Sequence, residues 1–176
     1  MKANVLLPSL LALTALSACA PKTAPPAPPP RAPESPAPPP ITVPRPAGDW
    51  RDAPLTPGSW TWNSPAGHST ASFALAGQPP LVQIACLARG TVQITHAGTV
   101  SSAAPLSITT SAGTFPLMSD PVIPGASATA VTLSARAPVL DAMAYSRGRF
   151  VIEVTGLAPS YLPSWPEVSR VVEDCR

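Results

Sequence analysis

Apolar and polar residues alternate in short runs over the last two-thirds of this chain. Gly, Pro and hydroxyl residues separate the runs, which lie at 59–64, 70–75, 81–86, 91–95, 106–111, 130–135 and 149–154. A period of two residues predicts a strand that buries one face. Seven short strands with frequent Gly and Pro between them predict a mainly β fold, either an antiparallel β-sandwich or a small barrel. Gly90 lies between two of these runs and predicts a hairpin turn, because it tolerates a positive φ.

Two segments near the end follow a helical period instead. Residues 138–148 predict a short helix that starts at Pro138 and ends at Gly148. In the last segment, Ser164 and Glu167 have the spacing of a capping box and predict the start of a C-terminal helix. Its apolar positions recur at i, i+3, i+4 and i+7, as Val168, Val171, Val172 and Cys175.

The N-terminus has a third pattern, an uncharged apolar run at residues 5–16 that follows Lys2. A helix of 12 residues spans about 18 Å, which is shorter than the roughly 30 Å hydrocarbon core of a bilayer. A basic start, a short apolar run and small residues after it are typical of a secretory signal peptide, here residues 1–18.

The signal segment ends in Leu16-Ser17-Ala18-Cys19, which resembles the lipobox of bacterial lipoproteins. The resemblance implies that Cys19 receives a diacylglycerol and becomes the first residue of a membrane-anchored protein. In that family an aspartate after the cysteine favours the inner membrane, and Ala20 in its place implies the outer membrane of a Gram-negative bacterium. The alternative is an ordinary secreted protein in which Cys19 has no role.

Residues 19–46 follow as a lipidated cysteine and a proline-rich linker, with 13 of the 27 prolines of the chain. Proline removes backbone donors and holds φ near −65°, so we expect a disordered, extended polyproline II spacer of roughly 80 Å. A PxxP ligand for a recognition domain is the alternative.

The composition changes at Ala47, and residues 47–176 predict one β-rich globular domain. This part has seven arginines, no lysine and eight acidic residues, so its net charge is −1 although the whole chain carries +2. A domain with this balance has no electrostatic footprint for nucleic acid, and we expect no nucleic-acid partner.

The three cysteines predict one disulfide. If lipid occupies Cys19, then Cys86 and Cys175 remain in an oxidising compartment, each on the predicted inward face of its element. Their bond would hold the C-terminal helix on the sheet. Two free thiols or a metal pair are the alternatives, but no CxxC spacing or supporting ligand cluster accompanies them.

Motifs for catalysis are absent from the sequence. It has no GxSxG elbow, phosphate loop, HExxH or dinucleotide fingerprint, so no cofactor and no metal are expected. His68 has hydroxyl neighbours that allow a Ser/His pair, and an exposed loop histidine is the plainer interpretation. His96 ends a predicted strand and is interpreted as structural. The acidic residues have structural interpretations as well, with Glu153 at a solvent-facing strand position, although a carboxylate pair for glycoside cleavage stays open.

Two clusters suggest contact with a partner. Arg147 and Arg149 flank Gly148 and predict an anion or partner contact, unless they serve only a helix end and a strand surface. The second cluster predicts an exposed apolar patch or, alternatively, packing of the last helix on the sheet. It consists of Leu157, Tyr161, Leu162 and Trp165.

The whole chain resembles uncharacterised proline-rich lipoproteins of alphaproteobacteria. The lipobox carries this resemblance together with residues 49–60 (DWRDAPLTPGSW), 140–150 (LDAMAYSRGRF) and 161–176 (YLPSWPEVSRVVEDCR). The family implies no activity. We therefore expect a non-enzymatic envelope lipoprotein that presents a binding or structural domain to an envelope protein or to peptidoglycan. The alternatives are an inhibitor of a hydrolase such as lysozyme or a protease, acting through a loop at residues 112–128, and an enzyme in which His68 or His96 lies in a cleft beside an acid.

Overall fold

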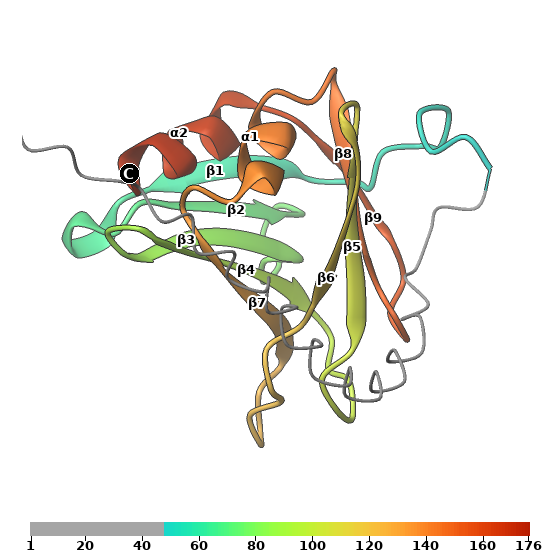
Figure 1. Ribbon diagram of the computed structural model, residues 1–176, viewed down its shortest axis with the longest axis horizontal. Coiled ribbons are helices and arrows are strands. Elements are labelled where there is room, and N and C mark those ends of the chain that lie inside the picture. The colour runs from blue at the N-terminus through green and yellow to red at the C-terminus, as the bar shows by residue number, and fades with distance from the viewer. Residues whose placement is uncertain (1–47) are drawn as a thin grey trace, which may run out of the picture. The chain divides into compact units, whose positions relative to one another are not determined.

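A computed structural model describes residues 48–176, which form two antiparallel sheets and two short α-helices (Figure 1). The predicted signal peptide, Cys19 and the proline-rich linker lie outside the described residues. One sheet has five strands in the order β1 (Ser59–Asn63), β2 (Thr70–Ala74), β3 (Val82–Ala88), β4 (Thr91–Ala97) and β7 (Ala128–Ser134). The other has four in the order β6 (Gly113–Met118), β5 (Pro105–Thr110), β8 (Arg149–Val154) and β9 (Ser160–Pro163). The predicted mainly β architecture is confirmed.

The inward face of the five-stranded sheet follows from its register. Trp60 lies opposite Phe73, which lies opposite Val82, and all three side chains are buried. The ring of Trp60 meets Phe73 edge-on at 5.3 Å, and its Nε1 donates to the carbonyl of Pro163 in β9 at 2.8 Å. One side chain therefore joins the two sheets through apolar packing and a buried hydrogen bond.

The segment before β1 links the same two sheet edges. The amide of Thr56 donates to the carbonyl of Tyr161 at 2.9 Å, and the Thr56 hydroxyl accepts from the Tyr161 amide at 2.9 Å. Two residues later, Gly58 has φ +143°, and a Cβ there would lie 2.8 Å from the Phe73 ring. The chain thus passes directly from the edge of the four-stranded sheet at β9 to the edge of the five-stranded sheet at β1.

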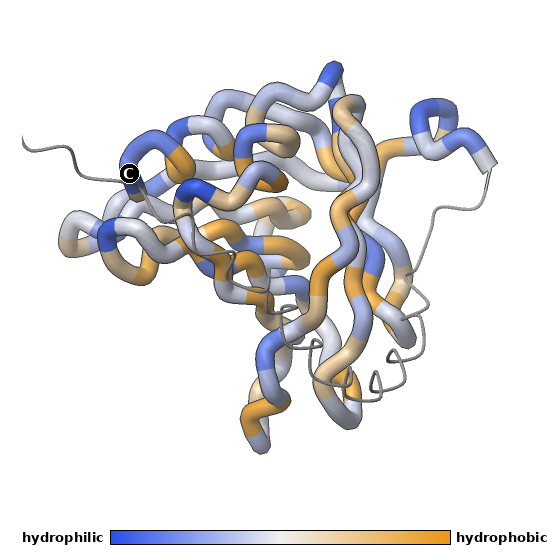
Figure 2. Tube along the Cα trace, viewed as in Figure 1, coloured by the Kyte–Doolittle hydropathy of each residue, from blue (hydrophilic) through white to orange (hydrophobic). Residues whose placement is uncertain are grey.

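Two helices pack between the sheets. α2 (Pro166–Asp174) lies on β1, β2 and β3, and α1 (Pro138–Ala144) lies on α2 and β5 (Figures 1 and 2). The apolar face predicted for the last helix is buried, and the disulfide between Cys86 and Cys175 is present with 5.4 Å between their Cα atoms. The predicted disulfide is confirmed. Within the described part of the chain, no helix is long and apolar enough to cross a membrane.

Several local predictions are wrong. Glu153 in β8, predicted at a solvent-facing strand position, is only 8% exposed. β6 and β9 were not predicted, because β6 is an exposed edge strand that contains Pro116 and β9 has only four residues. The predicted loop at 112–128 is therefore a strand over its first part. Ser164 does not cap α2, since the N-cap is Trp165 and the Ser164 hydroxyl donates to the last carbonyls of α1. α1 ends at Ala144, before the predicted Gly148.

Candidate functional site: the tip of the β6–β7 connection

The connection from β6 to β7 is fastened along the edge of β7. The amide of Asp120 donates to the carbonyl of Ala130 at 2.7 Å. Its carboxylate accepts two hydrogen bonds from Thr132, one from the amide at 3.1 Å and one from the hydroxyl at 2.7 Å. This carboxylate fills hydrogen-bonding positions that another strand would use, which protects the edge from further pairing.

The other leg is held by Gly98 at the end of β4. The amide of Gly98 donates to the carbonyl of Ser127 at 3.0 Å, and the carbonyl of Gly98 accepts from the Thr129 hydroxyl at 2.9 Å. Gly98 has φ +105°, and a Cβ there would lie 2.9 Å from a methyl group of Leu157. Only glycine meets both conditions without a shift of the neighbouring side chain. Both legs of the hairpin are therefore anchored to the sheet.

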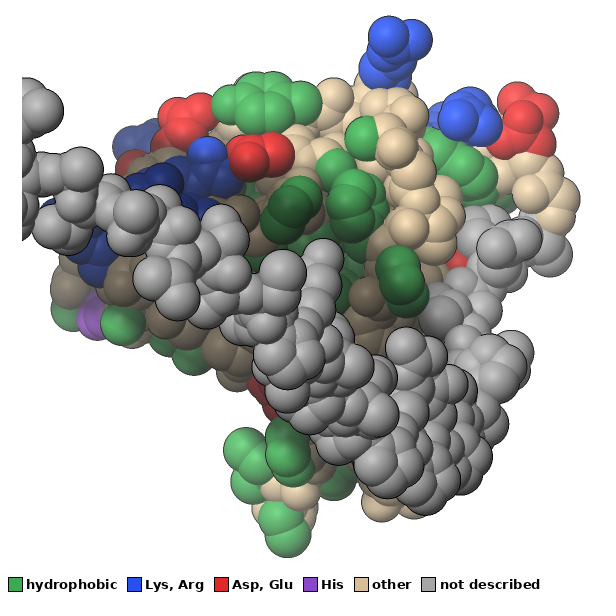
Figure 3. Space-filling model, in the orientation of Figure 1, with side chains coloured by type: hydrophobic (Ala, Val, Ile, Leu, Met, Phe, Trp, Pro, Cys, Tyr) green, Lys and Arg blue, Asp and Glu red, His purple; other side chains and the backbone are tan. Residues whose placement is uncertain are grey.

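β6 and β7 lie in different sheets and do not pair with each other, but the chain doubles back between them. Residues 120–127, which we call the hairpin tip, form this reversal and extend past the anchored legs (Figure 1, lower part). Pro121 and Pro124 restrict the backbone on either side of the apex, and a turn closes with the amide of Ala126 on the carbonyl of Ile123 at 3.0 Å. At the apex, Val122 is 40% and Ile123 is 72% exposed. The space-filling view shows hydrophobic side chains over this projection (Figure 3). A restricted loop that displays aliphatic side chains to water is typical of a contact surface.

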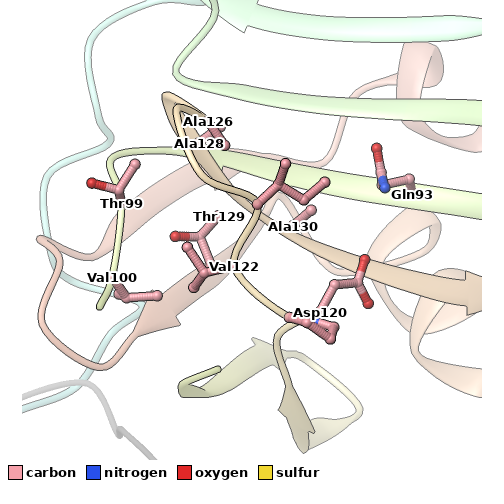
Figure 4. Close-up of a pocket in the computed structure, with 11 residues that line it drawn as sticks. Gln93, Thr99, Val100, Asp120, Val122, Ala126, Ala128, Thr129 and Ala130 are labelled. Atoms are coloured by element: carbon pink, nitrogen blue, oxygen red, sulfur yellow. The ribbon is translucent and has the colours of Figure 1, made fainter. Parts of the chain in front are cut away.

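A small hollow of about 70 Å³ lies beside the tip. Figure 4 shows the residues around it, which come from the tip (Val122), from strands β4 and β7 (Gln93 and Ala130) and from the segment after β4 (Thr99 and Val100). Among the residues that line it, only Asp120 is charged, and each of its carboxylate oxygens already accepts a hydrogen bond from Thr132. Its volume suits an aliphatic side chain and is too small for a cofactor.

His68 lies in a different, open hollow with acidic neighbours. Glu173 and Asp174 line this hollow together with His68, beside the disulfide, and Arg89 and Arg176 line it as well. The Nδ1 atom of His68 lies 3.2 Å from the carbonyl of Cys86, whereas Asp174 accepts from the hydroxyl of Ser69 at 2.6 Å. Since the Ser69 hydroxyl is committed to the carboxylate, no serine–histidine hydrogen bond forms here to activate a nucleophile.

His96 does form a hydrogen bond with a serine, but in the core. Its Nδ1 lies 2.8 Å from the carbonyl of Ala97, and its Nε2 lies 2.8 Å from the hydroxyl of Ser160 in β9. A carbonyl only accepts, so Nδ1 carries the proton and the Ser160 hydroxyl donates to Nε2. Burial lowers the pKa of His96 and outweighs the hydrogen bond to Ala97, which acts in the opposite direction. Both side chains are buried, and no acid among residues 48–176 is bonded to the ring, so this pair joins the two sheets as a neutral unit.

In each of the two clusters predicted to contact a partner, some side chains are used within the fold and others are exposed. Arg149 donates to the carbonyl of Ala53, whereas the side chain of Arg147 is exposed and has no hydrogen bond or ion pair within residues 48–176. In the second cluster, Leu162 is fully buried, so packing is its role, and Trp165 is 42% exposed. Among residues 48–176, no group of three or more His, Cys, Asp and Glu side chains is arranged for a metal.

Comparison with known proteins identified no relative of this chain. No protein family model, curated protein or solved structure matches the chain. The sequence did indicate the region of the tip, since it lies within the loop predicted at 112–128, and the pair Pro121 and Pro124 marks its restricted apex. Its anchoring by Asp120 and Gly98 was not predicted, because those contacts join residues far apart in the chain.

Proposed function

We propose that this protein is a lipid-anchored envelope protein, attached to the outer membrane through Cys19, whose domain binds another envelope protein through the hairpin tip without catalysing a reaction. The single observation that carries the binding role is the exposure of Ile123 at the apex of a loop whose two legs are anchored. An exposed aliphatic side chain on a mobile loop loses conformational entropy when it is bound. An anchored loop has lost most of that entropy during folding, so more of the contact energy remains for association.

The chemistry of the tip favours a protein with an apolar groove as the partner. Full burial of a Val or Ile side chain contributes about 1.5–3 kcal/mol, and Val122 and Ile123 retain a large share of that contribution for binding. Charged residues are absent from the tip beyond Asp120, which is bonded to Thr132. An uncharged aliphatic apex has few hydrogen bonds to offer to peptidoglycan or to nucleic acid.

The same observation supports a narrower second candidate, an inhibitor of an envelope hydrolase. A projecting apex bracketed by two prolines has a shape that enters the cleft of an enzyme, and the hollow beside it gives room for an aliphatic side chain of that enzyme. The two candidates share the contact surface and differ in whether the bound partner loses activity.

The geometry around the histidines supports a non-enzymatic role. His68 is bonded to a backbone carbonyl, and His96 is buried with Ser160 away from solvent. In the part of the chain that the structure describes, neither histidine has the combination of an accessible nucleophile and an orienting acid that acyl transfer requires.

Site-specific photo-crosslinking in living cells tests the binding role. A photoreactive amino acid replaces Ile123 in the full chain, and a matched variant carries it at Leu75, which is also exposed (53%) but lies after β2. We expect one discrete crosslinked protein from position 123 and none from position 75. Ile123→Asp should weaken binding of that protein by at least about 30-fold, because a carboxylate would be buried without a partner, whereas Leu75→Asp should leave it unchanged. Equal crosslinking at both positions would contradict the role of the tip.

Mass spectrometry and fractionation test the anchor separately. The N-terminal peptide should begin at Cys19 and carry the mass of a diacylglycerol and an acyl chain, and Cys19→Ser should move the protein out of the membrane fraction. An unmodified Cys19 in a secreted protein would contradict the anchor and leave the role of the tip open to its own test. Inhibition is tested by adding the full chain to the crosslinked partner, if that partner is a hydrolase, with Ile123→Asp as the control.

A further inference from the structure

Two aromatic side chains and one arginine are exposed where α1 ends and α2 begins. Tyr145 is 69% exposed, Trp165 is 42% exposed, and Arg147 is exposed as well. Their polar groups are a hydroxyl, an indole N–H and a guanidinium, and none of these groups has a hydrogen bond or ion pair within residues 48–176. Tyr, Trp and Arg are the residue types that dominate the energetics of binding surfaces. We call these three residues the aromatic–arginine cluster.

Hydrogen bonds of Ser164 bring the members of the cluster together. The hydroxyl of Ser164 donates to the carbonyl of Ala144 at 3.1 Å, and its amide donates to the carbonyl of Gly148 at 3.2 Å. In the sequence, each of these three bonded residues is the direct neighbour of one member of the cluster. The turn after α1 and the start of α2 therefore lie side by side, at the upper edge of Figure 1.

The backbone of this turn is fixed by the fold itself. The buried hydroxyl of Ser146 donates to the carbonyl of Arg149 and accepts from the amide of Ser111 at 3.0 Å. The Ser111 hydroxyl in turn accepts from the Arg147 amide at 3.0 Å. Gly148 has φ +82°, which glycine adopts without strain and which lets the chain turn into β8. A ligand that binds this turn loses little free energy in ordering the backbone.

The guanidinium of Arg147 is available for an anion. Asp141, the acidic residue of α1, already pairs with Arg176 at 2.6 Å. The last carbonyls of α1, which would repel an anion, are bonded to the hydroxyl of Ser164. A guanidinium binds a carboxylate through two parallel hydrogen bonds. A carboxylated ligand can therefore form this pair without breaking one within the described part of the fold.

The surroundings of the two rings favour a sugar over a protein as the ligand. Exposed neighbours of the turn are small, namely Ala112, Gly113 and Gly148, so they leave the ring faces open. The C–H groups on one face of a sugar ring are slightly positive and pack on the negative face of an aromatic ring. A protein partner instead needs roughly 800 Å² on each side and a rim of contacts that excludes water. Glycine and alanine provide little of either.

We propose that the aromatic–arginine cluster is a second binding site, whose ligand is a glycan that carries a carboxylate. The rings of Trp165 and Tyr145 pack on its sugar rings, and Arg147 pairs with its carboxylate. Peptidoglycan, through its muramic acid, and acidic polysaccharides of uronic acids share this chemistry. The inference goes beyond the proposed function and does not rest on the anchor or on the partner of the hairpin tip.

NMR titration of the full chain in detergent with three disaccharides tests the site. Two carry a carboxylate, N-acetylglucosaminyl-N-acetylmuramic acid and glucuronosyl-N-acetylglucosamine, and the third, chitobiose, is uncharged. We expect the indole N–H signal of Trp165, assigned with Trp165→Phe, to shift with at least one carboxylated disaccharide. The Kd of that disaccharide should be at least about tenfold lower than the Kd of chitobiose, because only the former pairs with the guanidinium. Which of the two binds more tightly identifies the source of the glycan.

Variants separate the contributions of the charge and of the rings. Arg147→Gln should raise the Kd of the carboxylated disaccharide about tenfold and leave that of chitobiose unchanged, whereas Arg136→Gln, at an exposed arginine after β7, should change neither. Trp165→Ala should abolish the binding of all three, and Leu87→Ala is the control for the loss of a similarly exposed apolar side chain, 46% exposed. A dispersed amide spectrum of each variant shows that it is folded.

Several results would overturn the proposal. These are the absence of any shift, equal affinity for chitobiose, or affinity for the carboxylated disaccharide that Arg147→Gln leaves intact. Tighter binding of a glutamate-rich peptide would assign the cluster to a protein partner, and Trp165-dependent sedimentation of the Cys19→Ser chain with phosphatidylglycerol vesicles would assign it to a lipid surface. Ile123→Asp in the hairpin tip should leave all disaccharide affinities unchanged, so failure of this site is distinguishable from failure of the tip.

Discussion

The buried pair of His96 and Ser160 predicts that this domain loses stability in mild acid. In the folded protein the His96 ring is neutral, since Nε2 accepts the Ser160 hydroxyl and burial lowers the pKa of the ring. In the unfolded chain the same ring takes up a proton at its ordinary pKa near 6.5. The unfolded state therefore binds more protons than the folded state as the pH falls below 6.5, and stability decreases.

The upper limit of this loss of stability follows from the protonation of His96 in the unfolded state alone. Protonation at an ordinary pKa of 6.5 stabilises the unfolded chain by about 0.1 kcal/mol at pH 7.5 and by about 1.4 kcal/mol at pH 5.5. The difference of about 1.3 kcal/mol is the upper limit of the loss between these two values. The loss stops once the pH falls below the lowered pKa of folded His96, because both states then carry the proton.

Urea unfolding at pH 7.5, 6.5 and 5.5, followed by tryptophan fluorescence, measures this loss against the variant His96→Gln. Glutamine offers an oxygen near the position of Nε2 and does not titrate, and all other groups cancel in the comparison. We expect the difference in unfolding free energy between wild type and variant to shrink by up to about 1.3 kcal/mol from pH 7.5 to 5.5. Parallel pH dependence in the two proteins would refute the neutral, buried imidazole. Ser160→Ala should destabilise the domain by about 1–2 kcal/mol at pH 7.5, because it removes the donor to Nε2.

Three further changes test the fold and the tip. Replacement of Cys86 and Cys175 by alanine should lower the unfolding free energy by up to about 4–5 kcal/mol, because the bond closes a loop with a sequence separation of 89 residues, and a urea midpoint equal to wild type would contradict that stabilisation. Trp60→Phe keeps the aromatic contact but leaves the carbonyl of Pro163 without its donor, so calorimetry should show a loss of about 1–2 kcal/mol, and no loss would mean that this bond does not join the sheets. Asp120→Ala removes both hydrogen bonds to the first leg of the hairpin, and amide exchange within the hairpin tip should accelerate severalfold while global stability falls by less than about 1.5 kcal/mol, whereas unchanged exchange would show that other contacts anchor the tip.

The local pattern of apolar and polar residues was sufficient to predict most of the fold. Seven of the nine strands could be predicted because a period of two residues is a property of adjacent positions and needs no knowledge of the partner strand. The spacing of apolar residues also predicted the apolar face of α2 and the burial of Cys86 and Cys175. The disulfide was predicted from that shared burial. The two missed strands show the limit, since β6 contains Pro116 and β9 is short, and both are strands because neighbouring strands provide their hydrogen bonds.

The candidate site depended far more on tertiary structure. The sequence indicated a loop within residues 112–128, but the anchoring of the hairpin tip needs Thr132 and Gly98, which lie in other strands. His96 and Ser160 are 64 residues apart, and no spacing rule relates them. Alternation placed Glu153 on the outward face correctly, but whether an outward face meets water depends on what else the chain packs there.

Sequence by itself therefore determined the class of fold, the disulfide and the inward faces of the strands, because these depend on the hydrophobicity of side chains and on the local geometry of the backbone. The tertiary structure decided which strands lie at an edge, which loop is rigid and which polar groups are buried together. Those properties arise from hydrogen bonds and packing between segments that are distant in the chain, and the order of residues does not encode them at short range.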